Sequence, residues 1–301
     1  MSIEKLAIAV TFHYREERIK YLEKISTQFD TLAQVVSVYI LTNEADNDKK
    51  SNILKCVKQS SNFFVEIHTP TYLGHPKLLT WSHFCIFKRL LYTDPSITHF
   101  MYLEDDIFVT RTNIEYWMKA RRELKSMKVI PSFLRFENKP CSLQLYSTDC
   151  TKKYSFYRLP KFKLSEDYYY INLPEPYQGM YLLDRELMTE HLHGPSSIPE
   201  YTPWGISEKA AAGLTFMNVP NGCYSRNFVG YEAKEKRIDP SCLVHHLPNN
   251  YSEDLNSPHG KIKIDELVAF SFFSVIISKM LDHPIFPKII LRLMGRRRQK
   301  M

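Results

Sequence analysis

Glycine is scarce in this chain, with only 9 among 301 residues, and no phosphate-binding glycine motif is formed. Neither G-x-x-x-x-G-K-[ST] nor G-x-G-x-x-G follows the first strand-like run. This argues against a P-loop enzyme and against a dinucleotide-dependent dehydrogenase. A nucleotide diphosphate would then need another partner, and a metal ion that bridges its phosphates to carboxylates is the plainest alternative.

Cysteine motifs and the features of a signal peptide are also absent from the sequence pattern. The six cysteines include no C-x-x-C pair and no spacing typical of a metal site. Residues 1–6 run directly into a strand-like stretch, without the apolar core of a signal peptide. We therefore expect a cytoplasmic protein with free thiols. In a secreted protein, Cys141 and Cys150 would be the first pair to test for a disulfide.

The chain has no dominating basic block outside its C-terminus, although its net charge is +7. Such a balance suits anionic ligands such as nucleotides, or an acidic membrane surface, and gives no reason to expect nucleic acid. Hydrophobic residues make up 44% and aromatic residues 13% of the sequence. A chain of this length and composition can bury one large core or two closely joined lobes.

Strand-like and helix-like segments alternate through the first 110 residues. Apolar runs typical of buried strands lie at residues 6–10, 35–41, 63–67 and 99–103, and helical spacing follows the first and third of them. This alternation predicts an α/β fold with a mainly parallel sheet flanked by helices. In such sheets ligands bind beyond the carboxyl ends of the strands. Three polar clusters fall at those ends, at residues 11–18, 43–48 and 104–106.

Three consecutive acids, Glu104, Asp105 and Asp106, interrupt an apolar stretch that resumes at Ile107. Adjacent carboxylates repel one another, and acids are poor strand formers. A solvated loop tip would relieve the repulsion, but a hard divalent cation such as Mg²⁺ or Mn²⁺ relieves it better and shares its oxygen ligands with phosphates. The position of the acids favours a metal site that holds a nucleotide diphosphate. Which two of the three acids bind the ion stays open.

An acidic motif at this position, after a β-α-β-α half of about 100 residues, resembles the GT-A glycosyltransferases; the resemblance covers roughly residues 5–230. In that family the motif holds Mn²⁺ or Mg²⁺ and the diphosphate of a sugar nucleotide. The resemblance implies that Glu104 and Asp106 are metal ligands and that Glu104 and Asp105 contact the nucleotide. It also implies nucleobase and ribose contacts from two strand-end loops, through Thr11, Phe12, His13, Arg15, Asn43 and Glu44.

The second half, residues 111–250, would then hold the acceptor. A helix with a basic outer face is expected at residues 117–127, a strand at 131–137, and a tyrosine-rich insertion over the cleft at 138–170. Rings of that insertion could stack on sugars, or they could be core or surface tyrosines. A strand at 177–183 leads into a helix that Asp184 caps.

The resemblance also suggests roles for residues further along the chain. Gln178 and Gly179 correspond to positions near the transferred sugar. Glu208 lies in the first turn of a short helix after Trp204, where the family often has its general base. Catalysis of inverting transfer needs such a carboxylate, but the helix dipole alone also explains an acid there. Weaker candidates for the base are Asp184 and Glu232.

Adjacent histidines, His245 and His246, end a later strand-like run. The family often completes its metal shell with a C-terminal histidine, although both residues could simply be hydrogen-bonded. Neighbouring side chains of a strand point to opposite faces. Only one can therefore reach the ion, and His245 is the prediction.

Residues 251–301 are expected to form a helical tail. Residues 267–277 are too short an apolar run to span a bilayer. Apolar residues then recur at helical spacing between 285 and 294, with basic residues on another face. This pattern is typical of an anchor to an anionic membrane surface. A helix packed on the core with a solvated basic end is the alternative.

Together, the acidic motif and the resemblance to GT-A enzymes imply a metal-dependent, inverting glycosyltransferase. Its expected donor is a UDP-sugar, and its expected acceptor is a glycan or lipid-linked saccharide. It would work in the cytoplasm, at the inner face of the membrane. Two alternatives stay open. One is a nucleotidyltransferase acting on sugar phosphates, which would be expected to carry a glycine-rich, basic loop after the first strand. The other is a non-enzymatic, membrane-peripheral interaction protein.

Overall fold

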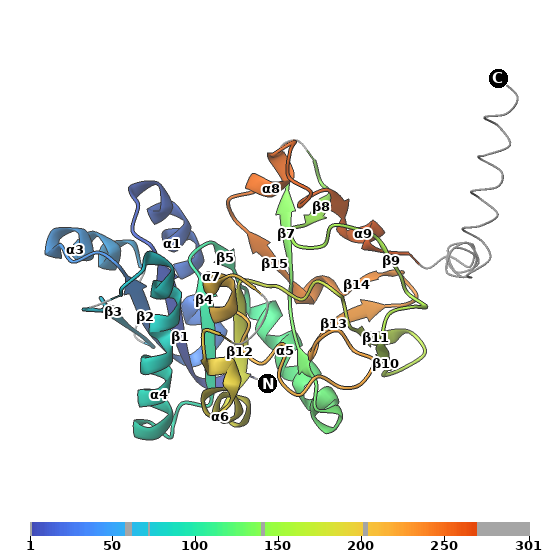
Figure 1. The fold of residues 1–301 in the computed structure, drawn as a ribbon, viewed down its shortest axis with the longest axis horizontal. Helices are drawn as coiled ribbons and strands as arrows, with labels where there is room; N and C mark the ends of the chain where they lie inside the picture. The colour runs from blue at the N-terminus through green and yellow to red at the C-terminus, as the bar shows by residue number, and fades with distance from the viewer. Residues whose placement is uncertain (1, 58–61, 72, 140–141, 201–203, 270–301) are drawn as a thin grey trace, which may run out of the picture.

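The computed structural model describes residues 2–57, 62–71, 73–139, 142–200 and 204–269. They form two lobes that lie side by side, with helix α5 (Arg111–Leu124) between them (Figure 1). None of the helices in these ranges is long and apolar enough to cross a membrane. The five cysteines within them have free thiols.

The first lobe is built on a five-stranded sheet. Strands β1 (Ile3–Phe12), β2 (Ala33–Thr42), β3 (Phe63–His68) and β4 (His99–Glu104) are parallel and lie in the order β3-β2-β1-β4. Residues Leu6 to Val10 of β1 are fully buried, which agrees with their unbroken apolar run. The predicted α/β fold with a mainly parallel sheet is therefore confirmed.

The fifth strand of this sheet comes from much later in the chain. Strand β12 (Met180–Asp184) pairs with β4 in the antiparallel direction, with Met180 opposite Leu103 and Leu182 opposite Met101. This pairing places the loop before β12 beside the acidic motif that follows β4.

Helices cover both faces of the first sheet. On one side α4 (His83–Thr93) packs against α6 (Arg185–His193); on the other α1 (Ile19–Ser26) packs against α3 (Asn47–Cys56). Asp184 caps α6 as predicted, because its side chain accepts a hydrogen bond of 2.8 Å from the Leu187 amide. The helical spacing after the third strand-like run corresponds to two elements, the 3₁₀ helix η2 (Pro76–Ser82) and α4.

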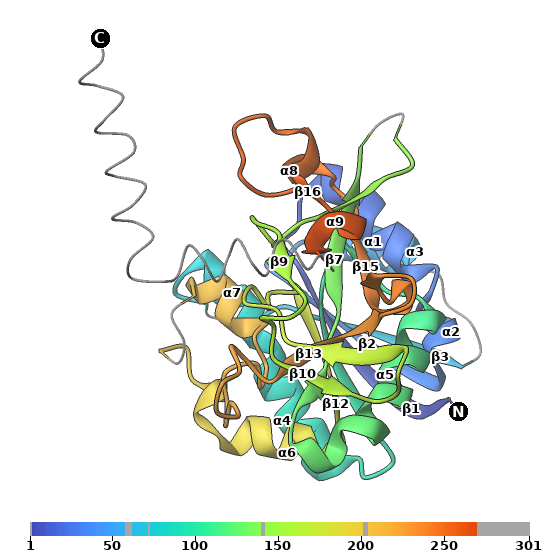
Figure 2. The same cartoon turned by 90° about the vertical axis from the view of Figure 1, so that its right-hand side faces the viewer.

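The second lobe is mainly antiparallel (Figure 2). One sheet has the order β16-β8-β7-β15-β5, and the other has the order β10-β11-β13-β14 with β6 beside β13. The strands of the first are β16 (Ile262–Lys263), β8 (Leu145–Ser147), β7 (Leu134–Asn138), β15 (Leu243–His246) and β5 (Ile107–Phe108). Those of the second are β10 (Lys161–Lys163), β11 (Tyr168–Ile171), β13 (Asn227–Glu232), β14 (Arg237–Ile238) and β6 (Ile130–Pro131).

Short elements complete the described chain: η1 (Glu16–Arg18), α2 (Phe29–Leu32), η3 (Lys125–Met127), β9 (Tyr154–Ser155), η4 (Pro195–Ser197), α7 (Ile206–Ala210), η5 (Pro240–Cys242), α8 (Asn250–Glu253), α9 (Ile264–Leu267) and β17 (Val268–Ala269). Strand β16 pairs with β8, and α9 packs on β8 and β14. The second lobe thus continues past residue 250, to Ala269. The amphipathic segment predicted at 285–294, with its membrane contact, lies outside the described residues.

One expectation for the second half needs correction, and one alternative that the sequence left open is decided. Helix α5 begins at Arg111, where Thr110 and Asn113 form a capping box, and Arg121 on its predicted basic outer face is 8% exposed and paired with Asp184. The tyrosines of the 138–170 insertion hold the lobe together. Tyr168 donates to Asp239 and Tyr170 to Glu123, both at 2.5 Å.

Candidate active site

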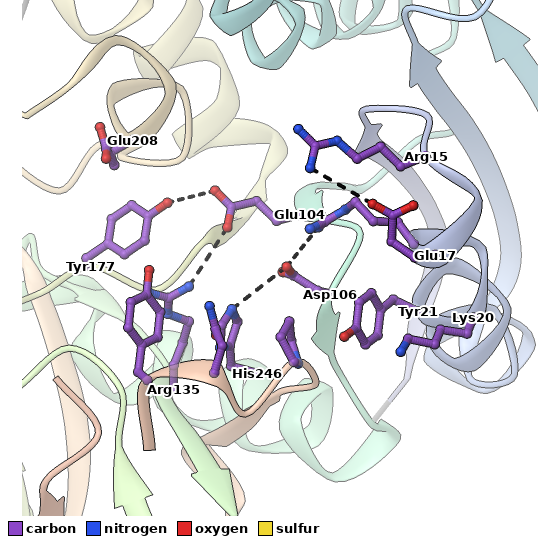
Figure 3. Close-up of a pocket in the computed structure, with 14 residues that line it drawn as sticks. Arg15, Glu17, Lys20, Tyr21, Glu104, Asp106, Arg135, Tyr177, Glu208 and His246 are labelled. Atoms are coloured by element: carbon purple, nitrogen blue, oxygen red, sulfur yellow. Dashed lines mark hydrogen bonds and ion pairs between the residues drawn. The ribbon is translucent and has the colours of Figure 1, made fainter. Parts of the chain in front are cut away.

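A cavity of about 480 Å³ opens where the carboxyl ends of β1 and β4 meet the second lobe. The first lobe contributes side chains from the loop after β1, from α1 and from the acidic motif, including Arg15, Arg18, Lys20, Glu104 and Asp106. The other side contributes Arg135, Tyr177, Glu208, His246 and Tyr251 (Figure 3). The cavity therefore lies where ligands are expected in an open α/β sheet.

Glu104, the first acid of the motif, lies beside Tyr177 and Arg135. One carboxylate oxygen accepts a hydrogen bond of 2.7 Å from the Tyr177 hydroxyl, and the other lies 3.8 Å from the Arg135 guanidinium. Burial, followed by the charge of Asp106, raises the pKa of Glu104 to about 7. A second positive charge beside Glu104 would therefore favour its ionised form.

Asp105, the middle acid, is bonded to another side chain of the protein. It is 4% exposed, does not line the cavity, and accepts two hydrogen bonds from Arg18, of which the Nε–Oδ2 distance is 2.8 Å. Burial raises its pKa to about 7 although Arg18 acts in the opposite direction. Direct contact between Asp105 and a nucleotide is not supported by this placement.

Asp106 has one oxygen that is bonded and one that is not. Its Oδ2 accepts a hydrogen bond of 2.8 Å from Arg18, whereas its Oδ1 is buried and has no hydrogen-bond partner among the described residues. A buried carboxylate oxygen without a partner is costly. Because Asp106 lines the cavity, a cation bound there would satisfy this oxygen.

The chemistry of the site fits a hard divalent ion held by two carboxylates, Glu104 and Asp106. The described part of the chain contains no ready-made group of three or more His, Cys, Asp or Glu ligands. Mg²⁺ is often bound through one or two carboxylates, with water and substrate phosphates completing its coordination. The donor set therefore fits an ion that arrives together with a diphosphate.

The choice between the two histidines is the reverse of the prediction. His245 stacks on Phe136, with ring centroids 4.9 Å apart, and hydrogen-bonds to Asn249 at 3.1 Å. His246 lines the cavity, with Nε2 3.8 Å from Asp106 Oδ2 (Figure 3). Its Nδ1 is bonded at 2.6 Å to the buried Glu137, which fixes the ring as carboxylates do for metal-binding histidines.

Gly179 lies beside the acids, whereas Gln178 does not reach the cavity. Gly179 has φ of +62°, and a Cβ atom there would come within 2.8 Å of Glu104 Oε2 and 3.2 Å of Arg135. Only glycine suits both this backbone and this space. Gln178 is 5% exposed and accepts a hydrogen bond of 2.8 Å from the Phe133 amide, so it has a structural role.

Of the nucleobase residues expected from the first two loops, only Arg15 lines the cavity. Thr11 and Phe12 are buried within the sheet, and His13 is exposed elsewhere. Asn43 accepts a hydrogen bond of 2.8 Å from the Tyr14 amide, which ties the two loops together. Glu44 pairs with Lys49 at 3.2 Å.

Sequence reasoning missed several cavity residues, which come from four separate segments: Arg18, Lys20, Arg135, Tyr177, His246 and Tyr251. A signal was available for Arg135, since it is a charged residue within the apolar start of β7 and is 5% exposed. Its Nε donates to Asp149 at 2.9 Å, and its guanidinium lies 4.6 Å from the ring centroid of Tyr177.

Glu208 stands at the border of two cavities. It lines the first cavity and also a second one of about 560 Å³, which includes Trp204 and Phe216. Helix α7 begins at Ile206, so Glu208 lies in its first turn as predicted. The Trp81 indole N–H donates to the Ile206 carbonyl at 2.8 Å. Asp184 caps α6 and Glu232 pairs with Arg237 at 2.6 Å; neither lines these two cavities.

Comparisons with known proteins identify no family. No protein-family model and no curated protein matches the chain. Among solved structures, the chain is similar to 4-diphosphocytidyl-2C-methyl-D-erythritol synthase from Anaerococcus prevotii DSM 20548, at 14% sequence identity and a TM-score of 0.34. The match covers 68% of this chain and 81% of that one. A likeness this distant decides nothing about activity.

Proposed function

We propose that this chain is a metal-dependent transferase that acts on a nucleotide-diphosphate sugar and moves the sugar to an acceptor hydroxyl. The observation that carries the proposal is the position of Glu208, which lines both the acid-containing cavity and the neighbouring aromatic one. A carboxylate between two cavities can reach a donor in one and an acceptor in the other. Inverting glycosyl transfer requires this arrangement of base, donor and acceptor.

The charges of the first cavity suit the diphosphate of the donor. Arg15, Arg18 and Lys20 line one wall, opposite Glu104 and Asp106. A divalent ion held by these two acids would neutralise the charge that develops on the leaving diphosphate. Arg18 keeps Asp106 in place through a hydrogen bond of 2.8 Å, and Tyr177 does the same for Glu104 at 2.7 Å. These contacts hold the carboxylates in fixed positions before the ligand arrives.

In the proposed reaction the acceptor oxygen forms a bond to the anomeric carbon while the bond from that carbon to the phosphate oxygen breaks. The electron pair of the broken bond goes to the diphosphate, and Glu208 takes the proton of the acceptor hydroxyl. This sequence inverts the anomeric configuration. A retaining enzyme would leave Glu208 without the role of base, so the stereochemistry of the product tests its assignment directly.

Nucleotidyl transfer to a sugar phosphate is the second candidate, and one observation favours it. Arg15, Arg18 and Lys20 bring three basic side chains from the segment after β1 to the cavity, as a nucleotidyltransferase would require. Glu16 and Glu17 lie among them in the sequence, and glycines are absent from the segment. The similar solved structure is named as a diphosphocytidyl synthase, which is nearer to this alternative than to glycosyl transfer. Its TM-score of 0.34 is too low to decide between the two.

Calorimetry and product analysis separate these candidates. Nucleoside diphosphates are titrated into wild-type protein and Asp106→Ala, with and without Mn²⁺. We expect Mn²⁺-dependent UDP binding that the variant loses. Release of UDP from a panel of UDP-sugars then indicates glycosyl transfer, whereas release of pyrophosphate from a nucleoside triphosphate and a sugar phosphate indicates nucleotidyl transfer. Absence of all nucleotide binding would refute both and favour an interaction protein.

A further inference from the structure

The second cavity, of about 560 Å³, has an aromatic wall made by residues that are distant in the sequence. The Trp204 ring lies between those of Tyr177 and Phe216, with centroid distances of 5.2 and 4.8 Å. The rings meet at 85° and 76°, so each holds its neighbour in a fixed orientation. Such a wall offers flat apolar faces to a ring-shaped ligand.

The charged residues of this cavity are mostly acidic. Among the described residues that line it are three acids, Asp149, Glu175 and Glu208, and two basic side chains, Arg135 and His259. With histidine counted as neutral, the formal charge of the lining is −2. Arg135 is already bound to Asp149, with an Nε–Oδ2 distance of 2.9 Å. Glu175 and Glu208 therefore give the cavity its net charge.

Glu175 is held rigidly at the cavity wall. It accepts hydrogen bonds from the Thr151 amide at 3.1 Å, from the Thr151 hydroxyl at 2.9 Å and from the Tyr154 hydroxyl. A carboxylate has about four acceptor positions, so it can take one more hydrogen bond from a ligand. Its charge is thus presented to the cavity without rearrangement.

The first cavity differs in its charge. It has four basic residues, Arg15, Arg18, Lys20 and Arg135, against the four acids Glu17, Glu104, Asp106 and Glu208. Three of these basic residues, Arg15, Arg18 and Lys20, line the first cavity and not the second. With formal charges of 0 and −2, the first cavity repels an anionic ligand less than the second does.

We propose that the second cavity binds the acceptor as an amine-bearing or uncharged sugar ring, with the amine preferred, and rejects sugars that carry a carboxylate. This inference rests on the proposed glycosyl transfer and specifies its acceptor. The aromatic wall would pack on one face of the ring, and Glu175 would attract the amine or accept a hydrogen bond from a hydroxyl. A uronate would place a third unpaired negative charge beside Glu175 and Glu208.

The test compares three acceptors that share one ring: the methyl glycosides of glucosamine, glucose and glucuronic acid. The full chain is assayed with Mn²⁺ and a UDP-sugar that it hydrolyses. We expect KM to rise in the order amine, neutral, acid, with at least a tenfold difference between the first and the last and with smaller changes in kcat. Equal KM values, or a lower KM for the glucuronide than for the glucosaminide, would overturn the proposal from measurements on the wild-type protein alone.

Two matched substitutions test whether the acceptor preference arises in the second cavity. Glu175→Gln removes the charge and keeps an acceptor, so the amine-to-acid preference should fall about tenfold, as expected for one unit charge at a partly solvated site. Glu166→Gln changes an exposed acid that pairs with Lys163 away from both cavities, and it should leave the preference unchanged. A preference unaltered in Glu175→Gln, with UDP binding intact, would contradict the assignment.

The experiments distinguish failure of the proposed glycosyl transfer from failure of the acceptor inference. If UDP does not bind and no UDP-sugar is hydrolysed, the proposed transferase is refuted, and the acceptor inference is refuted with it. If UDP binding and hydrolysis are normal but glucuronide is the best acceptor, only the inference about the second cavity is wrong.

Discussion

Arg18 joins Asp105 and Asp106 through one guanidinium group, donating to both carboxylates of the acidic motif. This contact links the segment after β1 to the end of β4, and it separates the roles of two adjacent acids. Both oxygens of Asp105 accept from Arg18, whereas Asp106 keeps one buried oxygen without a partner among the described residues. The middle acid therefore stabilises the fold, and the outer one remains available to a ligand.

Alanine at position 105 should destabilise the protein. Removing one partner of a fully buried ion pair costs about 3–5 kcal/mol. The Arg18 side chain is 28% exposed and keeps its bond to Asp106, so we expect a loss of about 2–3 kcal/mol. Urea denaturation measures this decrease in the free energy of unfolding.

Asp106→Ala should behave in the opposite way. It removes the 2.8 Å hydrogen bond from Arg18 to Oδ2, but it also removes a buried oxygen without a partner and a charge that repels Glu104 and Asp105. Because these effects oppose one another, its stability should stay within about 1 kcal/mol of wild type. Mn²⁺-dependent UDP binding should be lost, as measured by calorimetry. The reverse pattern, with Asp105→Ala stable and Asp106→Ala unfolded, would contradict this division of roles.

A methyl group on Gly205 should disturb Glu208. Gly205 has ordinary backbone angles, φ −64° and ψ 162°, so alanine is tolerated by the backbone. Its Cβ would come within 2.1 Å of Glu208 Oε2, and the carboxylate must move. We expect Gly205→Ala to lower kcat about tenfold, the size of effect that a displaced base can cause.

The double variant with Glu208→Gln provides the control for that experiment. If Gly205 acts only through Glu208, adding Gly205→Ala to Glu208→Gln should lower kcat no further. A thermal melt shows that each variant is folded. Independent, multiplicative losses would show that Gly205 affects the reaction by another route.

Two buried histidines of the first lobe should make stability depend on pH. Burial lowers the pKa of His83 and of His191 to about 3, from an ordinary value of 6.5. Below pH 6.5 the unfolded chain binds protons that the folded histidines refuse, so the free energy of unfolding falls as pH decreases. Each should contribute a loss of about 2 kcal/mol between pH 7 and pH 5.

A comparison of wild type with His83→Phe isolates this contribution. Glu104 and Asp105, with pKa values raised to about 7, act in the opposite direction over the same range, and the difference between the two proteins removes them. The variant should lose about 2 kcal/mol less than wild type between pH 7 and pH 5. Parallel stability curves would show that His83 does not titrate as expected.

Membrane contact through the C-terminal segment stays a prediction from sequence. Deletion of residues 284–301 should abolish sedimentation with liposomes containing anionic lipid, because the predicted apolar face and basic residues would both be lost. UDP binding should persist, since the residues that line the first cavity end at Tyr251. Unchanged sedimentation would favour a helix packed on the protein.

The first lobe was predictable because its strands are unbroken apolar runs that are easy to recognise. Residues 6–10 could only be a strand buried on both faces, and three acids after β4 marked one edge of the cavity. The partners of those acids were not predictable. Arg18, Tyr177 and Arg135 reach Glu104 to Asp106 only through tertiary packing, which no local pattern encodes.

The choice between His245 and His246 failed for a related reason. Alternation along a strand shows that the two side chains diverge, but not which one faces the ligand. Pairing of β15 with β5 and β7 decides it, and places His246 beside Glu137 and Asp106. The sequence also left open whether the tyrosines of the 138–170 insertion face the cavity. Tyr168 and Tyr170 instead donate to the half-buried acids Asp239 and Glu123.

Strand β12 lies far from its partner β4 in the sequence. This separation affects folding during synthesis and the behaviour of fragments of the chain. A ribosome must complete residue 184 before the sheet that begins at Ile3 acquires its last strand. Until then one edge of β4 exposes unpaired backbone N–H and C=O groups, which can form strand pairs with other nascent chains and cause aggregation. A gene fragment ending near residue 110 should therefore give insoluble product, whereas co-expression of a second fragment containing β12 offers a route to a soluble, reassembled protein.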